Sequence, residues 1–162
     1  MFDAAHLHLM LNHFPIIGTL IGGVLMAYAL LRSDRSLQKV VLVMWVVLAA
    51  MTPAVMKTGE EAEEKAEHTA GISEDVIHEH EEAAEVSHWL MVTLGLASLI
   101  TLLTGDKIGS SRNKTLFTFV TSLVVIAAMI RTGYLGGQIR HSKSAGATVI
   151  ENVGDHEGEH EH

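Results

Sequence analysis

The sequence contains no cysteine, and this absence removes several kinds of site at once. Disulfides, iron–sulfur clusters, zinc–thiolate centres and covalently attached c-type haem all require cysteine side chains. Aromatic residues make up only 5% of the chain, too few for large stacking surfaces. The formal net charge of −8 excludes the basic surface that binding to nucleic acid requires, so no nucleic-acid partner is expected.

Long apolar segments separated by blocks of charge dominate the chain instead. Hydrophobic residues make up 48% of the 162 residues, beside 19 acidic residues and 11 histidines. Four apolar segments have about the 20 residues that a helix needs to cross ~30 Å of hydrocarbon. They are residues 14–31, 37–56, 86–105 and 116–135. The sequence predicts an all-α, integral membrane four-helix bundle, with the lipid bilayer as its first partner.

The two short connections, at 32–39 and 105–114, carry an excess of lysine and arginine. The positive-inside rule places such loops in the cytoplasm. Both termini and the long connection after the second helix then face outward, which is the periplasm if the membrane is a bacterial inner membrane. Every histidine of the chain falls in or beside these outward segments.

The outward connection at 57–88 is rich in helix-forming residues. A break follows at 69–71, and Ser73 can cap a new helix whose first turn holds Glu74 and Asp75. We expect the second and third helices to extend past the membrane as a helical hairpin, over 60–68 and 74–87. Residues 1–141 then form the membrane domain, and residues 142–162 form a flexible tail rich in histidine and glutamate.

Two local patterns concern helix packing. Gly18 and Gly22 are spaced four apart, which predicts close approach of the first helix to a neighbour. Pro53 interrupts the hydrogen bonding of the second helix, and the adjacent Thr52 hydroxyl can satisfy the carbonyl that Pro53 leaves free.

The positive-inside orientation brings histidines from three helices to the same side of the membrane. Neutral imidazoles on facing helices are the usual ligands of noncovalently bound haem, and a buried imidazole without a partner costs free energy. We therefore expect His13 and His88 to ligate a haem b, with His8 and His141 as ligands or close neighbours. A cation within a membrane helix requires a counter-charge, and a haem propionate could supply it. The cations in question are Arg131 and Arg140, although Glu60 or Glu61 could pair with Arg131 equally well.

Two alternatives remain open. Glu85-x-x-His88 matches one unit of a di-iron bundle, and Glu60, Glu64 and His78 could complete an iron or zinc site in the hairpin. The second helix offers no second Glu-x-x-His unit, and a solvated acidic face also accounts for the pattern. The other alternative is a cofactor-free structural subunit, whose polar residues only hold helices together.

Motifs at the two ends of the membrane domain resemble those of a family of uncharacterised bacterial four-helix membrane proteins. They are His8-x4-His13-Phe14-Pro15-Ile16 at the start, and Gly133-Tyr134-Leu135-Gly136-Gly137 followed by His141 at the end. The resemblance spans about 6–141, and it departs at Leu9, where relatives often have proline. Some relatives are joined to respiratory electron-carrier domains, which implies a redox role. The expected function is a b-type haem electron-transfer protein or respiratory-chain subunit, forming a homo-oligomer or respiratory complex and exchanging electrons with quinone or a periplasmic carrier.

Overall fold

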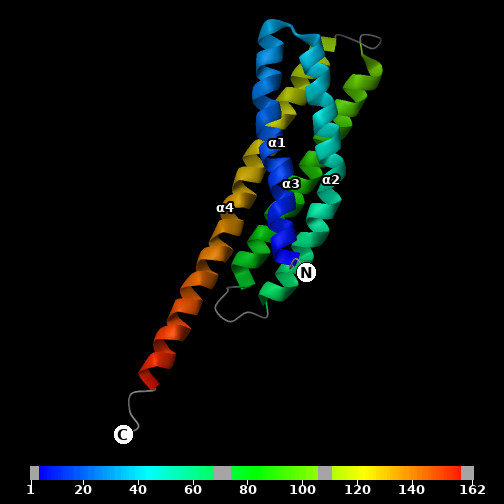
Figure 1. The fold of residues 1–162 in the computed structure, drawn as a ribbon. Helices are drawn as coiled ribbons and strands as arrows, with labels where there is room; N and C mark the ends of the chain where they lie inside the picture. The colour runs from blue at the N-terminus through cyan, green and yellow to red at the C-terminus, as the bar shows by residue number, and fades with distance from the viewer. Residues whose placement is uncertain (1–3, 68–73, 106–110, 158–162) are drawn as a thin grey trace.

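The structure, a computed structural model, describes residues 4–67, 74–105 and 111–157, with side chains described as far as Gln138. It consists of four helices that run antiparallel in sequence order and form one bundle (Figure 1). These are α1 (Ala4–Arg32), α2 (Arg35–Glu67), α3 (Glu74–Thr104) and α4 (Ser111–Glu157). The predicted all-α, four-helix architecture is confirmed.

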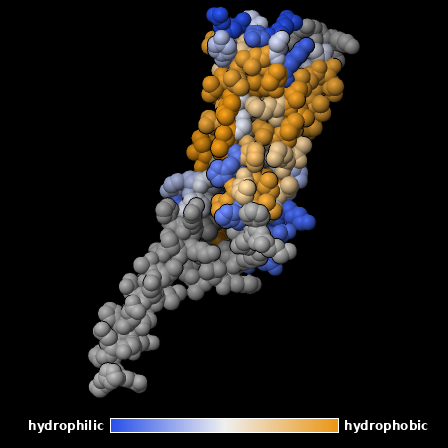
Figure 2. Space-filling view, in the orientation of Figure 1, coloured by the Kyte–Doolittle hydropathy of each residue, from blue (hydrophilic) through white to orange (hydrophobic). Residues whose placement is uncertain are grey.

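Each helix contains a segment long and apolar enough to cross a membrane: His6–Arg32, Arg35–Ala62, Ile77–Thr104 and Arg112–Gln138. Figure 2 shows an apolar belt between two polar ends. Large apolar side chains in this belt point outward, for example Leu103 at 74% exposed and Phe117 at 64% exposed. A water-soluble bundle buries such side chains, so this surface suggests a membrane protein.

Side chains at the helix ends account for the short turns. Asp34 Oδ1 accepts hydrogen bonds from the backbone N–H groups of Ser36 and Leu37, both at 3.0 Å, and so caps the start of α2. Helix α3 ends at Gly105, which adopts a φ of 46° and donates its N–H to Thr101 O at 3.1 Å. The turn at Ser33 and Asp34 therefore joins α1 to α2 as antiparallel neighbours.

Glycines on α1 bring it close to α2, as their spacing predicted. A side chain at Gly18 would collide with Leu48, and one at Gly22 would collide with the indole of Trp45. Trp45 is completely buried beside these glycines. It belongs to a core that also contains Met26, Val41, Leu42, Leu48, Met91, Leu94, Val125 and Met129.

Helix α2 continues through Pro53. Proline at this position leaves the carbonyl four residues earlier, that of Ala49, without its helical donor. The Thr52 hydroxyl donates to Ala49 O at 2.8 Å, so the predicted compensation is confirmed.

Both arms of the predicted hairpin are helical, up to Glu67 in α2 and from Glu74 in α3. His68 lies outside the described residues, and the extension of the hairpin beyond lipid stays a prediction. Helix α4 continues to Glu157 and projects past the other helices (Figure 1), so its helix does not end at Ser142. The flexibility of residues 142–162 also stays a prediction.

The two helical hairpins, α1–α2 and α3–α4, repeat one arrangement. Gly23 of α1 packs against Ile126 of α4, and Gly95 of α3 packs against Ala49 of α2. Adding 72 to a residue number in α1 gives the equivalent residue in α3, so Gly23 corresponds to Gly95. Adding 77 to a number in α2 gives the equivalent residue in α4, so Ala49 corresponds to Ile126. Exchanging the two hairpins therefore converts one contact into the other. The bundle therefore has an approximate two-fold axis along its length, with α1 and α3 parallel and diagonally opposite, although α2 packs more extensively on α3 than α1 does on α4.

The axis passes through one contact whose two members are equivalent positions. Thr19 Oγ1 of α1 lies 3.6 Å from Met91 Sδ of α3, and both residues are completely buried. Their separation in sequence is the same 72 residues. This contact fixes the level at which the two diagonal helices face each other.

Candidate functional site: a histidine pair in the bundle interior

His8 projects into the interior from α1. It precedes the buried Thr19 by eleven residues, which is within about 20° of the same helix face. His8 Nδ1 lies 3.1 Å from Val55 O of α2 and 3.5 Å from Thr58 Oγ1. A carbonyl oxygen only accepts, so Nδ1 carries the proton and donates it to Val55. The neutral ring therefore has its unprotonated nitrogen at Nε2.

His80 occupies the equivalent place on α3. It precedes Met91 by eleven residues and therefore lies on the same interior face and at the level of His8. His80 Nδ1 donates to Thr132 O of α4 at 3.1 Å, which leaves Nε2 as its unprotonated nitrogen too.

A glycine accompanies each histidine. A side chain at Gly59 would meet the His8 ring 3.1 Å from Cε1, and one at Gly136 would meet the His80 ring at 3.0 Å. Each glycine follows the carbonyl that accepts from its histidine by one helical turn. The repeated unit is thus an interior imidazole, a carbonyl on the next helix and a glycine beside the ring. Four helices contribute to one level, α1 and α3 with histidines and α2 and α4 with glycines.

Hydroxyl groups are placed differently in the two hairpins. In the first, the Thr58 hydroxyl donates to Val55 O at 3.0 Å within α2, whereas in the second the hydroxyl bonds join α4 to α3. Thr132 Oγ1 donates to Ala83 O at 2.9 Å, and it lies 2.9 Å from Ser87 Oγ. The equivalent positions in the first hairpin are Pro15 and Val55, which have no hydroxyl. The carbonyl that accepts from His80 is therefore tied to α3 by side-chain bonds that the first hairpin does not have.

Two polar atoms in this half of the bundle are buried without a partner among the described residues: Asn12 Oδ1 and His88 Nδ1. Asn12 lies one turn from His8 on the same face of α1, and His88 packs edge-on against Trp89 with ring centroids 5.4 Å apart. Buried polar atoms are normally hydrogen-bonded, so these two atoms have capacity for a further polar contact.

The predicted ligands His13 and His88 differ in exposure, since His13 is exposed and His88 is half-buried, and their ligation of a haem stays a prediction. His13 is exposed, and its Nδ1 donates to Leu9 O in its own helix. Arg131 is also exposed, and within the described part of the chain it forms no ion pair with Glu60 or Glu61. The side chains of Arg140 and His141 lie outside those described, so their roles stay predictions.

The alternative metal site in the hairpin receives no support from the geometry. Glu60, Glu64 and Glu85 are exposed. His78 is also exposed and pairs with Glu81 at 3.6 Å and Glu82 at 3.4 Å on its own helix. Among the described residues no three histidine or carboxylate side chains are arranged to hold a metal ion. These residues form a solvated face.

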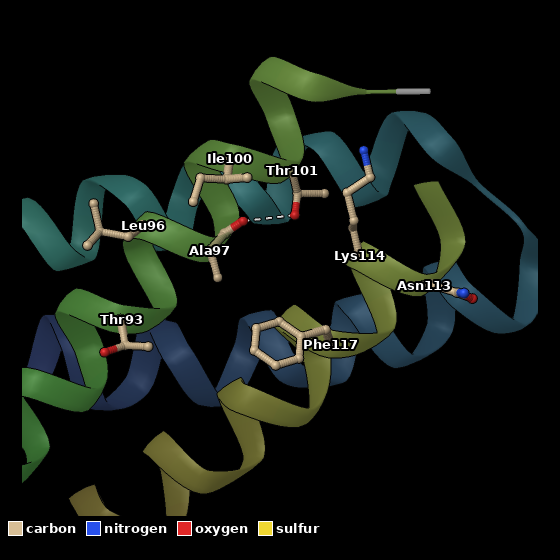
Figure 3. Close-up of a pocket in the computed structure, with 8 residues that line it drawn as sticks. All are labelled: Thr93, Leu96, Ala97, Ile100, Thr101, Asn113, Lys114 and Phe117. Carbon is tan, nitrogen blue, oxygen red and sulfur yellow. Dashed lines mark hydrogen bonds between the residues drawn. The ribbon is translucent and has the colours of Figure 1, made fainter. Parts of the chain in front are cut away.

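A groove of about 480 Å³ lies between α3 and α4, towards the other end of the bundle (Figure 3). Lys114 borders it, but its Nζ donates to Thr104 Oγ1 at 2.9 Å and to Gly105 O at 2.7 Å. The groove is lined by Thr93, Leu96, Ala97, Ile100, Thr101, Asn113, Lys114 and Phe117. It is mostly apolar and separate from the histidine pair.

Comparison with protein families, curated proteins and solved structures gave no match to this chain. The fold and the site define its class by themselves: a bundle of four apolar helices suited to a membrane, with a two-fold-related pair of imidazoles inside.

Proposed function

We propose that the chain is a membrane-embedded electron-transfer protein that holds a b-type haem between His8 and His80. The observation that carries this proposal is the repeated unit around each imidazole. Haem in apolar bundles is held by histidines from facing helices, and a bond from Nδ1 to a carbonyl orients a ligating histidine and raises the basicity of Nε2. Both features are present on α1 and α3.

The surroundings of the pair suit a flat macrocycle. Gly59 and Gly136 let each imidazole pack directly against the neighbouring helix, which holds both rings in the orientation that a ligated macrocycle between α1 and α3 would need. The unpartnered Asn12 Oδ1 and His88 Nδ1 offer polar contacts nearby. Haem would supply a one-electron redox centre, and the protein would bind it, fix both ring orientations and exclude water through the apolar core beneath it.

Orientation follows from charge. We place the basic turns in the cytoplasm of a bacterial inner membrane and the histidine pair at the outward end, with both termini outside. The hairpin then extends beyond the hydrocarbon, and the redox centre lies close to the outer membrane surface. This location suits exchange of electrons with quinone in the membrane or with a soluble carrier outside it.

An absorption spectrum of the purified protein tests the proposal. We expect the Soret and α bands of bis-histidine haem, and we expect His8→Ala and His80→Ala each to weaken or remove them. His13→Ala and His78→Ala are the matched controls, because each removes an exposed imidazole from the same helix. A native protein without haem, or unchanged spectra in both test variants, would refute the assignment. Loss only in His13→Ala and His88→Ala would restore the ligand pair expected from sequence.

A further inference from the structure

Lys114 borders one end of the groove between α3 and α4. Its side chain reaches from the start of α4 to the end of α3, where the ammonium donates to Thr104 Oγ1 and Gly105 O. An ammonium group has three N–H donors, so one donor remains after these two bonds. Both acceptors are neutral, and Lys114 forms no ion pair with any residue that the structure describes. This end of the groove is therefore positively charged.

The rest of the groove is an apolar channel on the outer surface of the bundle. Leu96 and Ile100 of α3 form one wall, and their side chains are 56% and 57% exposed. Phe117 of α4 directs its ring towards α3 from the other side (Figure 3). Ala97 lines the groove between these walls with only a methyl group (Figure 3). An apolar chain that lies in the groove therefore contacts both helices.

The position and the length of the groove match one leaflet of a bilayer. The apolar span of α3 ends at Thr104 and that of α4 begins at Arg112, so Lys114 lies at the boundary of the apolar belt. Thr93, at the far end of the groove, precedes Thr104 by eleven residues, or about 16 Å along the helix. Half of the hydrocarbon thickness is about 15 Å. The groove thus extends from the boundary to the middle of the bilayer, as one acyl chain does.

We propose that this groove binds an anionic phospholipid of the adjacent leaflet, with one acyl chain against Ala97 and Phe117 and the phosphate at the Lys114 ammonium. A lysine ammonium binds phosphate as a point charge, and basic sites between membrane helices bind anionic lipids in this way. A free anion has no chain to place in the groove, and an uncharged apolar molecule has no contact for the ammonium. The proposal rests on the membrane location proposed above, but not on haem.

Native mass spectrometry of the full-length protein in detergent, titrated with phosphatidylglycerol or phosphatidylcholine, measures both contacts. We expect phosphatidylglycerol to bind about fivefold more tightly, since one cation contributes. Lys114→Gln should bind the two lipids equally, whereas Lys39→Gln, which removes an exposed cation at the same end, should keep the preference. Ala97→Leu fills the groove, leaves the bonds of Lys114 intact and should weaken the binding of both lipids. Ala127→Leu adds the same side chain at an exposed position of α4 and should bind them normally.

Three outcomes would overturn the proposal. Equal loss of the preference in Lys114→Gln and Lys39→Gln would show general attraction to a basic surface. Unchanged binding in Lys114→Gln or in Ala97→Leu would place the phosphate or the acyl chain elsewhere. Full displacement by millimolar glycerol 3-phosphate would identify a site for free anions. The lipid titration does not require haem, and reporter fusions test the membrane location separately, so failure here is distinct from failure of the proposed function.

Discussion

Replacing Gly95 by alanine tests the packing on which the two-fold relation depends. The added Cβ would lie against the Cβ of Ala49, closer than two carbon atoms approach in proteins. Neither atom can rotate away, because each is attached directly to its backbone. Helices α2 and α3 must therefore separate by on the order of 1 Å to restore a normal carbon–carbon contact of about 3.5–4 Å.

The expected magnitude combines two opposing effects. Overpacking of a close contact costs about 1–3 kcal/mol, and this rigid contact should fall near the upper end. Alanine is better than glycine in a helix by about 1 kcal/mol. Gly95→Ala should therefore lower the free energy of unfolding by about 2 kcal/mol.

Two other glycines provide the matched controls. A Cβ at the equivalent Gly23 would meet Ile126 Cδ1 at 3.1 Å, the end of a flexible side chain that can move, so the two effects should nearly cancel. A Cβ at Gly133 meets nothing within 4 Å, so Gly133→Ala should stabilise the protein by up to about 1 kcal/mol. Unfolding in detergent, followed by Trp fluorescence, measures all three variants. Equal stability of Gly95→Ala and Gly133→Ala would contradict the contact between α2 and α3.

The hydroxyl bonds around Thr132 predict that the two haem ligands are unequal. His80→Ala should lose haem, while His8→Ala should retain part of it and recover a bis-imidazole spectrum when imidazole is added; equal behaviour of the two would show that the Ser87–Thr132 contact does not stabilise the His80 side. Topology is tested by reporter fusions: one at Asp34 should report the cytoplasm and one at the C-terminus the outside, and a cytoplasmic C-terminus would reverse the proposed orientation.

The helices could be predicted from the sequence because membrane-spanning segments are defined by length and composition alone. The role of Thr52 beside Pro53 could also be predicted, since it depends on local backbone geometry. The spacing of Gly18 and Gly22 predicted close packing of α1 but not that the neighbour is α2. His80 could not be predicted in the same way. Titratable residues spaced three and four apart, as in the stripe from His78 to His88, tend to mark the solvated face of a helix. The interior face of α3 is the face that carries the buried Met91. His80 lies eleven residues before Met91 and therefore on that same face.

The equivalence of the α1–α2 and α3–α4 hairpins cannot be recognised as a repeat in the sequence, and the reason bears on function. Equivalent core positions carry side chains of different size, such as Trp45 and Ser122 or Met26 and Ser98, all completely buried. A core of fixed volume favours this compensation, because two large side chains at both places would overpack it. At the axis, Thr19 likewise faces Met91. His8 and His80 are an exception, since these equivalent positions carry the same polar side chain, and each donates from Nδ1 to the neighbouring helix. Packing alone gives no reason to place two imidazoles there, whereas a ligand that is bound from both sides of the axis requires them.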